Sequence, residues 1–120
     1  QVLDVSDAFA EQNPQAVKAF IDVYARGMQW AAQNQSAAVA LMLKKYPEID
    51  EVGTIVELQL LSGAWASDES AQKKNGYLSM DDNSWKPTIE VLRKAGQLKE
   101  APELSKVYST EFLPGQPYLP

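Results

Sequence analysis

Two groups of acidic residues carry the side chains that bind divalent cations or exchange protons in general acid–base catalysis. One group is Asp81 and Asp82, and the other comprises Glu48, Asp50 and Glu51. Neither group has the spacing of a calcium-binding loop, and each lies where a helix is expected to begin. Acids at such positions accept hydrogen bonds from free backbone N–H groups and favour the helix dipole. We therefore interpret both groups as helix caps and expect no metal site.

Three other residues are candidates for ligand binding. Ser6 and Asp7 follow a short β-prone segment, a position where open α/β folds often collect ligands. Helix capping alone also explains this pair, and Asp7 would repel an anion. Tyr77 follows a glycine in an expected loop, where a cleft could lie. We interpret most other aromatic residues as core, because they recur at helical spacing.

The composition excludes several classes of function. The chain of 120 residues contains no Cys and no His, so it holds no Ser-His-Asp triad, Cys nucleophile or Cys/His zinc site of its own. We expect no catalytic residue and no cofactor here. The net charge is -5 and the basic residues are scattered, which disfavours nucleic acid as a partner. No run approaches the roughly 18 apolar residues of a membrane span.

The best-defined element is a long helix over residues 14–34. Asn13 suits its N-cap, and Pro14 suits the first helical position. Steps of three and four separate the apolar residues of one face, which are Val17, Phe20, Ile21, Tyr24, Met28 and Ala31. Such a face needs a surface to lie on. We expect other segments of these 120 residues to cover it only in part.

The other segments read as a strand, further helices and a tail. Residues 2–5 resemble a strand that has no partner in this sequence, and Ser6 and Asp7 begin a helical turn that ends by Gln12. About five helices are expected in all, the later ones over residues 36–46, 50–65 and 67–75 and from Asp81, Asp82 or Ser84 to about residue 95. Because Pro87 would interrupt a helix that begins at Asp81, the pattern favours a start at Ser84 or a kink.

Residues 97–120 form an irregular tail that contains several prolines and packs on the body of the segment. Its expected anchors are apolar or aromatic, namely Val107, Tyr108, Phe112 and Leu113. Because the chain begins with Gln rather than Met, we expect it to be part of a longer protein.

In this order, the elements resemble the C-terminal part of bacterial solute-binding proteins of ABC importers for nitrate, sulfonates, taurine and thiamine-pyrimidine precursors. The stretch NGYLSMDDNSWKPTIEVL and the later VYSTEFLP are most similar to the pyrimidine-precursor-like branch. The matching positions are Gly76, Tyr77, Met80, Asp81, Trp85, Thr88, Ile89, Leu92, Val107, Tyr108, Glu111, Phe112, Leu113 and Pro114. The resemblance spans nearly all 120 residues, which would form one C-terminal segment of a longer protein.

The resemblance implies a two-lobed α/β fold of the type II periplasmic-binding-protein kind, of which this segment supplies mainly α structure. It implies a small-molecule solute, held mainly by residues outside the segment, an ABC permease as partner and a periplasmic or other extracytoplasmic location, with a lipid anchor as an alternative. We also expect the isolated segment to self-associate through exposed apolar helix faces. Two alternatives remain: a fragment of a superfamily enzyme that makes the thiamine pyrimidine, and a stand-alone helical interaction domain.

Overall fold

The computed structural model describes residues 2–120, so Gln1 of the expected 1–120 segment lies outside the described residues. Within this range the chain forms six α-helices, one 3-10 helix and no strand. The elements are α1 (Asp7–Gln12), α2 (Pro14–Gln33), α3 (Gln35–Lys45), α4 (Glu51–Trp65), α5 (Ala71–Asn75), α6 (Asp82–Lys94) and η1 (Leu104–Lys106). The mainly α class of this segment is thereby confirmed.

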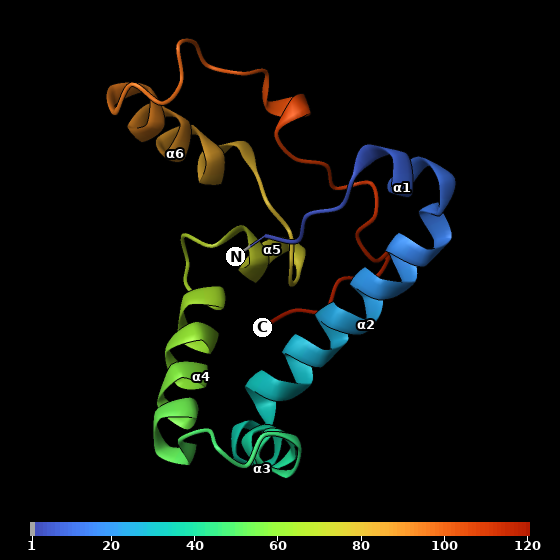
Figure 1. Cartoon of the computed structure of the whole chain (residues 1–120), viewed down its shortest axis with the longest axis vertical. Coiled ribbons are helices and arrows are strands. Elements are labelled where there is room, and N and C mark those ends of the chain that lie inside the picture. Colours follow the sequence, from blue (N-terminus) through green and yellow to red (C-terminus); the bar gives the residue numbers. More distant parts are fainter. Residues whose placement is uncertain (1) are drawn as a thin grey trace.

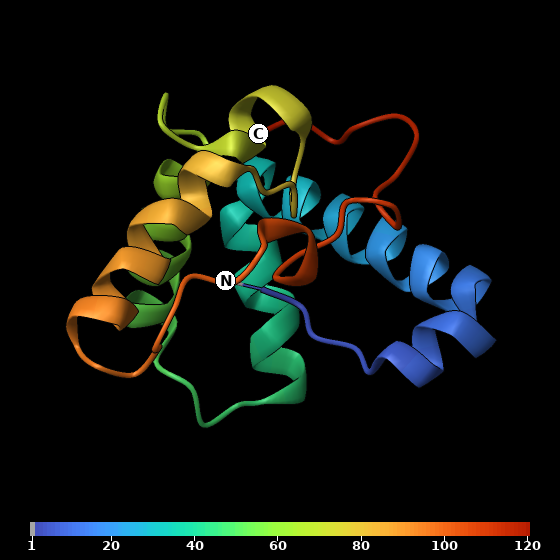
Figure 2. The ribbon, with the colours of Figure 1, turned by 90° about the horizontal axis from the view of Figure 1, so that it is seen from above.

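Helices α2, α3 and α4 set the shape of the molecule. Helices α2 and α4 form two arms that α3 joins at one end, and α5 and the C-terminus lie between the arms (Figure 1). Helix α2 contacts α1, α3 and α4, and α3 contacts α4. Helix α6 and the chain that follows it cross the opposite end of the molecule, as both views show (Figure 2). No helix among the described residues is long and apolar enough to cross a membrane.

The expected strand over residues 2–5 is wrong for this chain. These residues adopt no regular secondary structure and are exposed. A strand exists only through hydrogen bonds to a neighbouring strand, and no other part of residues 2–120 supplies one. Residues 2–5 therefore have a β-prone composition but lack the pairing that would make them a strand.

Polar caps fix several helix boundaries as the sequence predicts. The Ser6 hydroxyl accepts a hydrogen bond from the Phe9 N–H at 3.3 Å and begins α1. The Asp50 carboxylate accepts from the Gly53 N–H at 2.7 Å and begins α4. At the other end of a helix, Gly76 caps α5 with φ of +90°, a backbone conformation that disfavours any side chain.

Three helix starts differ from the expectation. Helix α3 begins at Gln35, after Asn34, rather than at Ser36. Helix α5 begins after Ser70 rather than at residues 67–69, because the Ser70 hydroxyl accepts the hydrogen bond of the Gln72 N–H.

Helix α6 begins after Asp81 rather than Ser84, because Asp81 accepts from both the N–H and the hydroxyl of Ser84. Pro87 therefore lies inside α6. Because Pro87 has no N–H to donate, one carbonyl in the first turn of α6 lacks a helical hydrogen bond. That turn is exposed, so solvent can reach the carbonyl.

The apolar face of α2 is covered only in part by the rest of the chain. Val17 and Met28 are buried, Ile21 and Tyr24 are half-buried, and Phe20 remains 58% exposed. Partial cover is what the sequence predicts for this face. Helix α4, although rich in apolar residues, contains no buried residue at all.

The tight core lies where the second half of α2 meets the turn after α5. Ala25, Met28 and Tyr77 are buried together, with Trp65 and Tyr118 packed against them. The last residues of the chain hold this cluster closed through three hydrogen bonds that span large sequence separations. Tyr77 N–H donates to the Tyr118 carbonyl at 2.8 Å, the Tyr118 hydroxyl to Asp22 Oδ1 at 3.0 Å, and Gln29 Nε2 to the Leu119 carbonyl at 2.9 Å.

Candidate functional site

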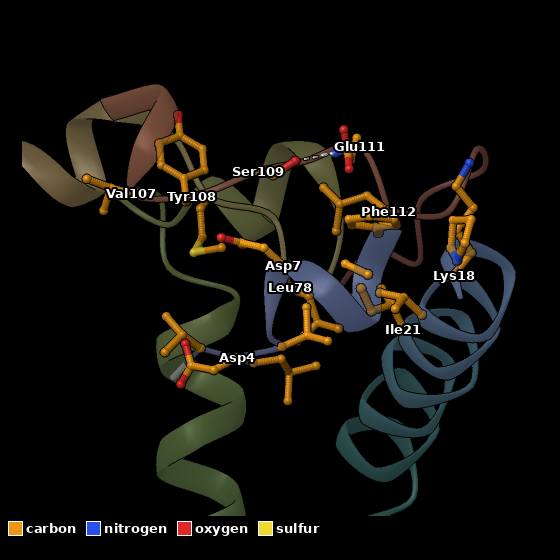
Figure 3. Close-up of a pocket in the computed structure, with 18 of the residues that line it drawn as sticks. Asp4, Asp7, Lys18, Ile21, Leu78, Val107, Tyr108, Ser109, Glu111 and Phe112 are labelled. Atoms are coloured by element: carbon orange, nitrogen blue, oxygen red, sulfur yellow. Dashed lines mark hydrogen bonds between the residues drawn. The ribbon is translucent and has the colours of Figure 1, made fainter. Parts of the chain in front are cut away.

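A hollow of about 930 Å³ opens between the N-terminal segment, α1, the first half of α2, the turn after α5 and the tail. In Figure 3, Ile21 and Phe112 lie on one side of it, Val107 and Tyr108 on the other. The lining is mostly apolar or aromatic and draws on every one of these segments. It comprises Val2, Leu3, Asp4, Val5, Asp7, Ala10, Glu11, Pro14, Val17, Lys18, Ile21, Leu78, Met80, Trp85, Ser105, Lys106, Val107, Tyr108, Ser109, Glu111, Phe112 and Leu113.

An aromatic pair forms part of the rim of this hollow. Trp85 on α6 and Tyr108 after η1 stack with ring centroids 6.2 Å apart and an interplanar angle of 12°. The Tyr108 hydroxyl donates a hydrogen bond to Asp82 Oδ1 at 3.0 Å. Partial burial, together with this bond to a carboxylate, raises the pKa of Tyr108 above its ordinary value. The pair thus ties the tail to the start of α6.

The hollow carries more negative than positive side chains. Its lining includes four carboxylates, on Asp4, Asp7, Glu11 and Glu111, and two ammonium groups, on Lys18 and Lys106. Lys106 also lies 3.3 Å from the Glu103 carboxylate, which partly neutralises it. The chemistry of these groups disfavours an anion in the hollow.

One of the three candidate ligand-binding residues lies at the hollow. Asp7 contributes to its wall, whereas Ser6 is outside the lining and its hydroxyl caps α1. Tyr77 is only 2% exposed and also lies outside the lining. Its ring meets Trp65 edge-on at a centroid distance of 5.6 Å, and burial raises the pKa of its hydroxyl. The structure therefore separates Tyr77 from Asp7 rather than bringing the two together.

The acidic groups act as helix caps at two positions. Asp50 caps α4 and Asp81 caps α6, and the hydrogen bonds from Ser84 hold the pKa of Asp81 below its ordinary value. Among residues 2–120, no set of three or more His, Cys, Asp or Glu side chains is arranged to hold a metal ion. The capping interpretation of these two acids is confirmed.

Sequence reasoning did not anticipate the Trp85–Tyr108 pair or the contacts of Tyr118. Both depend on where an irregular, proline-containing tail runs, and no periodic pattern encodes such a path. The available signal was compositional, since Tyr108 and Tyr118 are large aromatic residues in a tail with little secondary structure. Tail residues of this kind are often held against a core.

Comparison with known proteins gives two findings. Residues 1–38 match the model of the family described as NMT1/THI5 like. The chain is also 31% identical over 117 residues to the riboflavin-binding protein RibY of Chloroflexus aurantiacus. That alignment covers 95% of this chain and 33% of the relative, so the chain spans about one third of the length of the curated protein that it matches.

The two matches fall on different lengths of the chain. The family match falls on α1, α2 and the residues before and just after them, and the similarity to the riboflavin-binding protein extends through nearly all of the remaining chain. Together they confirm the resemblance of this chain to the solute-binding proteins of the nitrate, sulfonate and thiamine-precursor group.

Proposed function

We propose that the chain is the C-terminal segment of an extracytoplasmic solute-binding protein that delivers a small aromatic heterocycle to an ABC permease. The observation that carries the proposal is the similarity of nearly the whole chain to a riboflavin-binding protein. The family match at residues 1–38 supports the same kind of protein. Riboflavin or a pyrimidine precursor of thiamine is the solute that we favour.

The charges of the segment support an uncharged aromatic solute over an anionic one. Nitrate, sulfonates and taurine each carry a negatively charged group, which proteins bind with cationic side chains or clustered N–H donors. The hollow of this chain has four carboxylates to two ammonium groups. The charges that this segment would bring to solute recognition are therefore poorly suited to an anion.

The proposed mechanism is binding without chemistry. Two lobes close over the solute and hold it until the permease accepts it, and the free energy comes from burying the solute and pairing its polar groups. We expect most contacts to the solute to come from the two thirds of such a protein that this chain does not match. The helical segment described here would then support the shape of one lobe.

A titration of the encoded protein that contains this segment tests the proposal. Riboflavin, a hydroxymethylpyrimidine, taurine and nitrate are added in turn, and binding is followed by calorimetry, with quenching of flavin fluorescence as a second signal for riboflavin. We expect dissociation constants in the micromolar range or tighter for a heterocycle only. The matched control is the 120-residue chain alone, which should bind none of the four. Tight binding of nitrate or taurine would contradict the heterocycle.

The enzyme alternative makes a different demand on the encoded protein. A pyrimidine synthase of this superfamily that consumes its own histidine would need that residue outside the chain, because these 120 residues contain no His. An upstream signal peptide or lipobox followed by α/β sequence would support the solute-binding protein. A cytoplasmic start with a histidine motif would support the enzyme, and an initiating Met next to Gln1 would support a small helical domain.

A further inference from the structure

The turn after α5 contains a leucine in a backbone conformation that suits glycine. Leu78 has φ of +69°, and no other non-glycine residue among residues 2–120 has a positive φ. The Ser79 N–H donates to the Gly76 carbonyl at 3.2 Å, so residues 76–79 form a type II turn with Leu78 at its third position. That position normally holds Gly or Asn, because most side chains are strained there. The turn therefore carries its strain at one residue.

The strained residue lies between the tight core and the hollow. Tyr77, just before it, is buried in the core, and Leu78 packs against the same cluster while it also lines the hollow (Figure 3). Ser79, just after it, is buried, and its Oγ atom has no hydrogen-bond partner among the described residues. Backbone strain and an unsatisfied buried hydroxyl each cost free energy, and strained residues often cluster at switches. This turn combines both costs at adjacent positions.

Gln72 on α5 is the side chain that holds the present form of the turn. The Leu78 N–H donates to Gln72 Oε1 at 3.2 Å in a half-buried setting. In the type I form of such a turn, the central peptide is turned over, and φ at the third position is about −90°, which any residue adopts without strain. The Tyr77 carbonyl would then point where the Leu78 N–H points now. Because a glutamine amide carries donors as well as an acceptor, Gln72 could bind that carbonyl through Nε2 after its amide group rotates.

We propose that residues 76–79 are a two-state switch, in which the peptide between Tyr77 and Leu78 flips and Gln72 binds it in either orientation. The start of the turn stays fixed, because the Tyr77 N–H donates to the Tyr118 carbonyl and the Tyr77 ring is held in the core. Relief of strain at Leu78 favours the flipped form, and each form keeps one hydrogen bond to Gln72. The two forms therefore differ little in free energy.

The switch changes the polar group that the turn presents on the side away from Gln72. That group is the Tyr77 carbonyl in the present form and the Leu78 N–H in the flipped form. Because Leu78 lines the hollow, whatever packs against the turn there selects one form by offering a donor or an acceptor. The inference goes beyond solute binding and does not depend on which solute the protein takes.

Selective isotope labelling isolates the peptide that is proposed to flip. When Tyr carries ¹³C at its carbonyl and Leu carries ¹⁵N, NMR can detect only the amides of leucines that follow a tyrosine. In this chain these are Leu78 and Leu119, so the second signal is an internal reference at the tail. The measurement uses the encoded protein that contains this segment, and the signal that disappears in Leu78→Met is the one from Leu78.

Two substitutions of Gln72 push the switch in opposite directions. In the unaltered protein, relaxation dispersion should detect a minor form at Leu78 that exchanges on the microsecond-to-millisecond scale. Gln72→Glu leaves only acceptors and should abolish the dispersion, whereas Gln72→Lys leaves only donors and should move the main Leu78 signal to the shift of the minor form. Gln59→Lys is the matched control, because Gln59 is an exposed glutamine on α4, and it should leave both signals unchanged.

Leu78→Gly tests the strain itself and does not depend on the Gln72 variants. With ¹⁵N-glycine in place of leucine, the same experiment detects the amide at residue 78. Glycine adopts positive φ at no cost, so the population of the flipped form should fall about fivefold or more. This variant still decides the matter if Gln72→Lys does not fold.

Three results would overturn the proposal. One is a Leu78 signal without dispersion in the unaltered protein and at the same shift in Gln72→Lys. Another is a minor form whose population neither the Gln72 variants nor Leu78→Gly changes. The third is a common shift of the Leu78 and Leu119 signals, since this would show that the tight core opens as a whole instead of one peptide flipping within it.

Discussion

The two halves of α2 have one apolar face in common, yet they meet different surroundings. The second half, with Ala25 and Met28, packs into a closed core that the last residues of the chain seal with hydrogen bonds. The first half, with Val17 and Ile21, faces a hollow whose far wall is exposed or half-buried. A continuous apolar face thus says that a helix is covered, but not which part of a protein covers it. Other segments of the described chain bury the closed core, whereas they leave the hollow open.

The largest expected contrast comes from truncating one side chain in each half of α2. Met28→Ala removes buried apolar volume from the closed core and should lower the free energy of unfolding by about 3 kcal/mol. Phe20→Ala removes a larger side chain that is mostly exposed and should change it by less than about 0.5 kcal/mol. Urea denaturation of both variants, followed by circular dichroism, gives the two values. Equal losses would remove the distinction between the halves.

The closed core should also be sensitive at Gly76. A Cβ atom there would lie 2.7 Å from Pro117 Cβ and 3.1 Å from the Tyr118 carbonyl oxygen, and φ is +90°. Gly76→Ala therefore combines backbone strain with a clash against the tail and should cost about 2 kcal/mol.

Gly96→Ala is the matched control for Gly76→Ala. Gly96 has φ of +72°, and a Cβ atom there meets nothing within 4 Å, so only the strain of about 1 kcal/mol applies. The same urea experiment compares the two variants. A smaller loss at Gly76 than at Gly96 would mean that the tail does not seal the core.

Alkaline pH should loosen the closed core before it affects the helices themselves. Burial raises the pKa of Tyr77, and the hydrogen bond to the Asp22 carboxylate is the main reason that the pKa of Tyr118 is raised. The unfolded chain loses these protons near pH 10.0, before the folded chain does, so stability is full below that pH and falls as pH rises above it. Thermal melts between pH 8 and 11 measure the fall, and Tyr118→Phe should make it shallower. A melting temperature that stays constant to pH 11 would contradict this.

The smallest expected effect concerns a polar group beside the core. Ser79 is buried, and its Oγ atom has no hydrogen-bond partner among the described residues. Ser79→Ala removes an unsatisfied group and should raise the free energy of unfolding by up to about 1 kcal/mol. Ser84→Ala is the contrasting variant, because the Ser84 hydroxyl donates to Asp81 Oδ1 at 2.8 Å, and it should lower stability. Destabilisation by Ser79→Ala would reveal a partner for that hydroxyl.

The sequence predicts local structure better than it predicts contacts between segments that lie far apart in the chain. The bounds of α2 follow from apolar spacing and from Pro14 at its first turn, and the start of α4 follows from the Asp50 cap, because these signals act within one or two turns. The Asn13 side chain, expected to cap α2, makes no capping hydrogen bond.

The favoured start of α6 at Ser84 was wrong, because capping by Asp81 outweighs the unfavourable Pro87. Helix propensity alone does not decide that balance. The strand over residues 2–5 failed for a different reason, since no other segment of residues 2–120 forms a strand that could pair with it.

The candidate site shows the same limit. Asp7 lies at the hollow and Tyr77 lies in the core, although both were chosen from local context alone. The path of the tail decides which of them meets a cavity, because Tyr118 covers Tyr77 while Tyr108 lines the hollow. Contacts between residues that lie far apart in the chain produce no periodic pattern in the sequence.

The aromatic pairs give each region an optical reporter of its own. Trp65 lies edge-on to Tyr77 in the closed core, whereas Trp85 stacks on Tyr108 at the rim of the hollow. The third tryptophan, Trp30, is 43% exposed and lies outside both aromatic pairs, so it is the one to replace by Phe. Emission from Trp65 then follows the folding of the core, while emission from Trp85 shifts when the rim loses contact with water. Single-tryptophan versions of one chain can thus time the folding of the two regions separately.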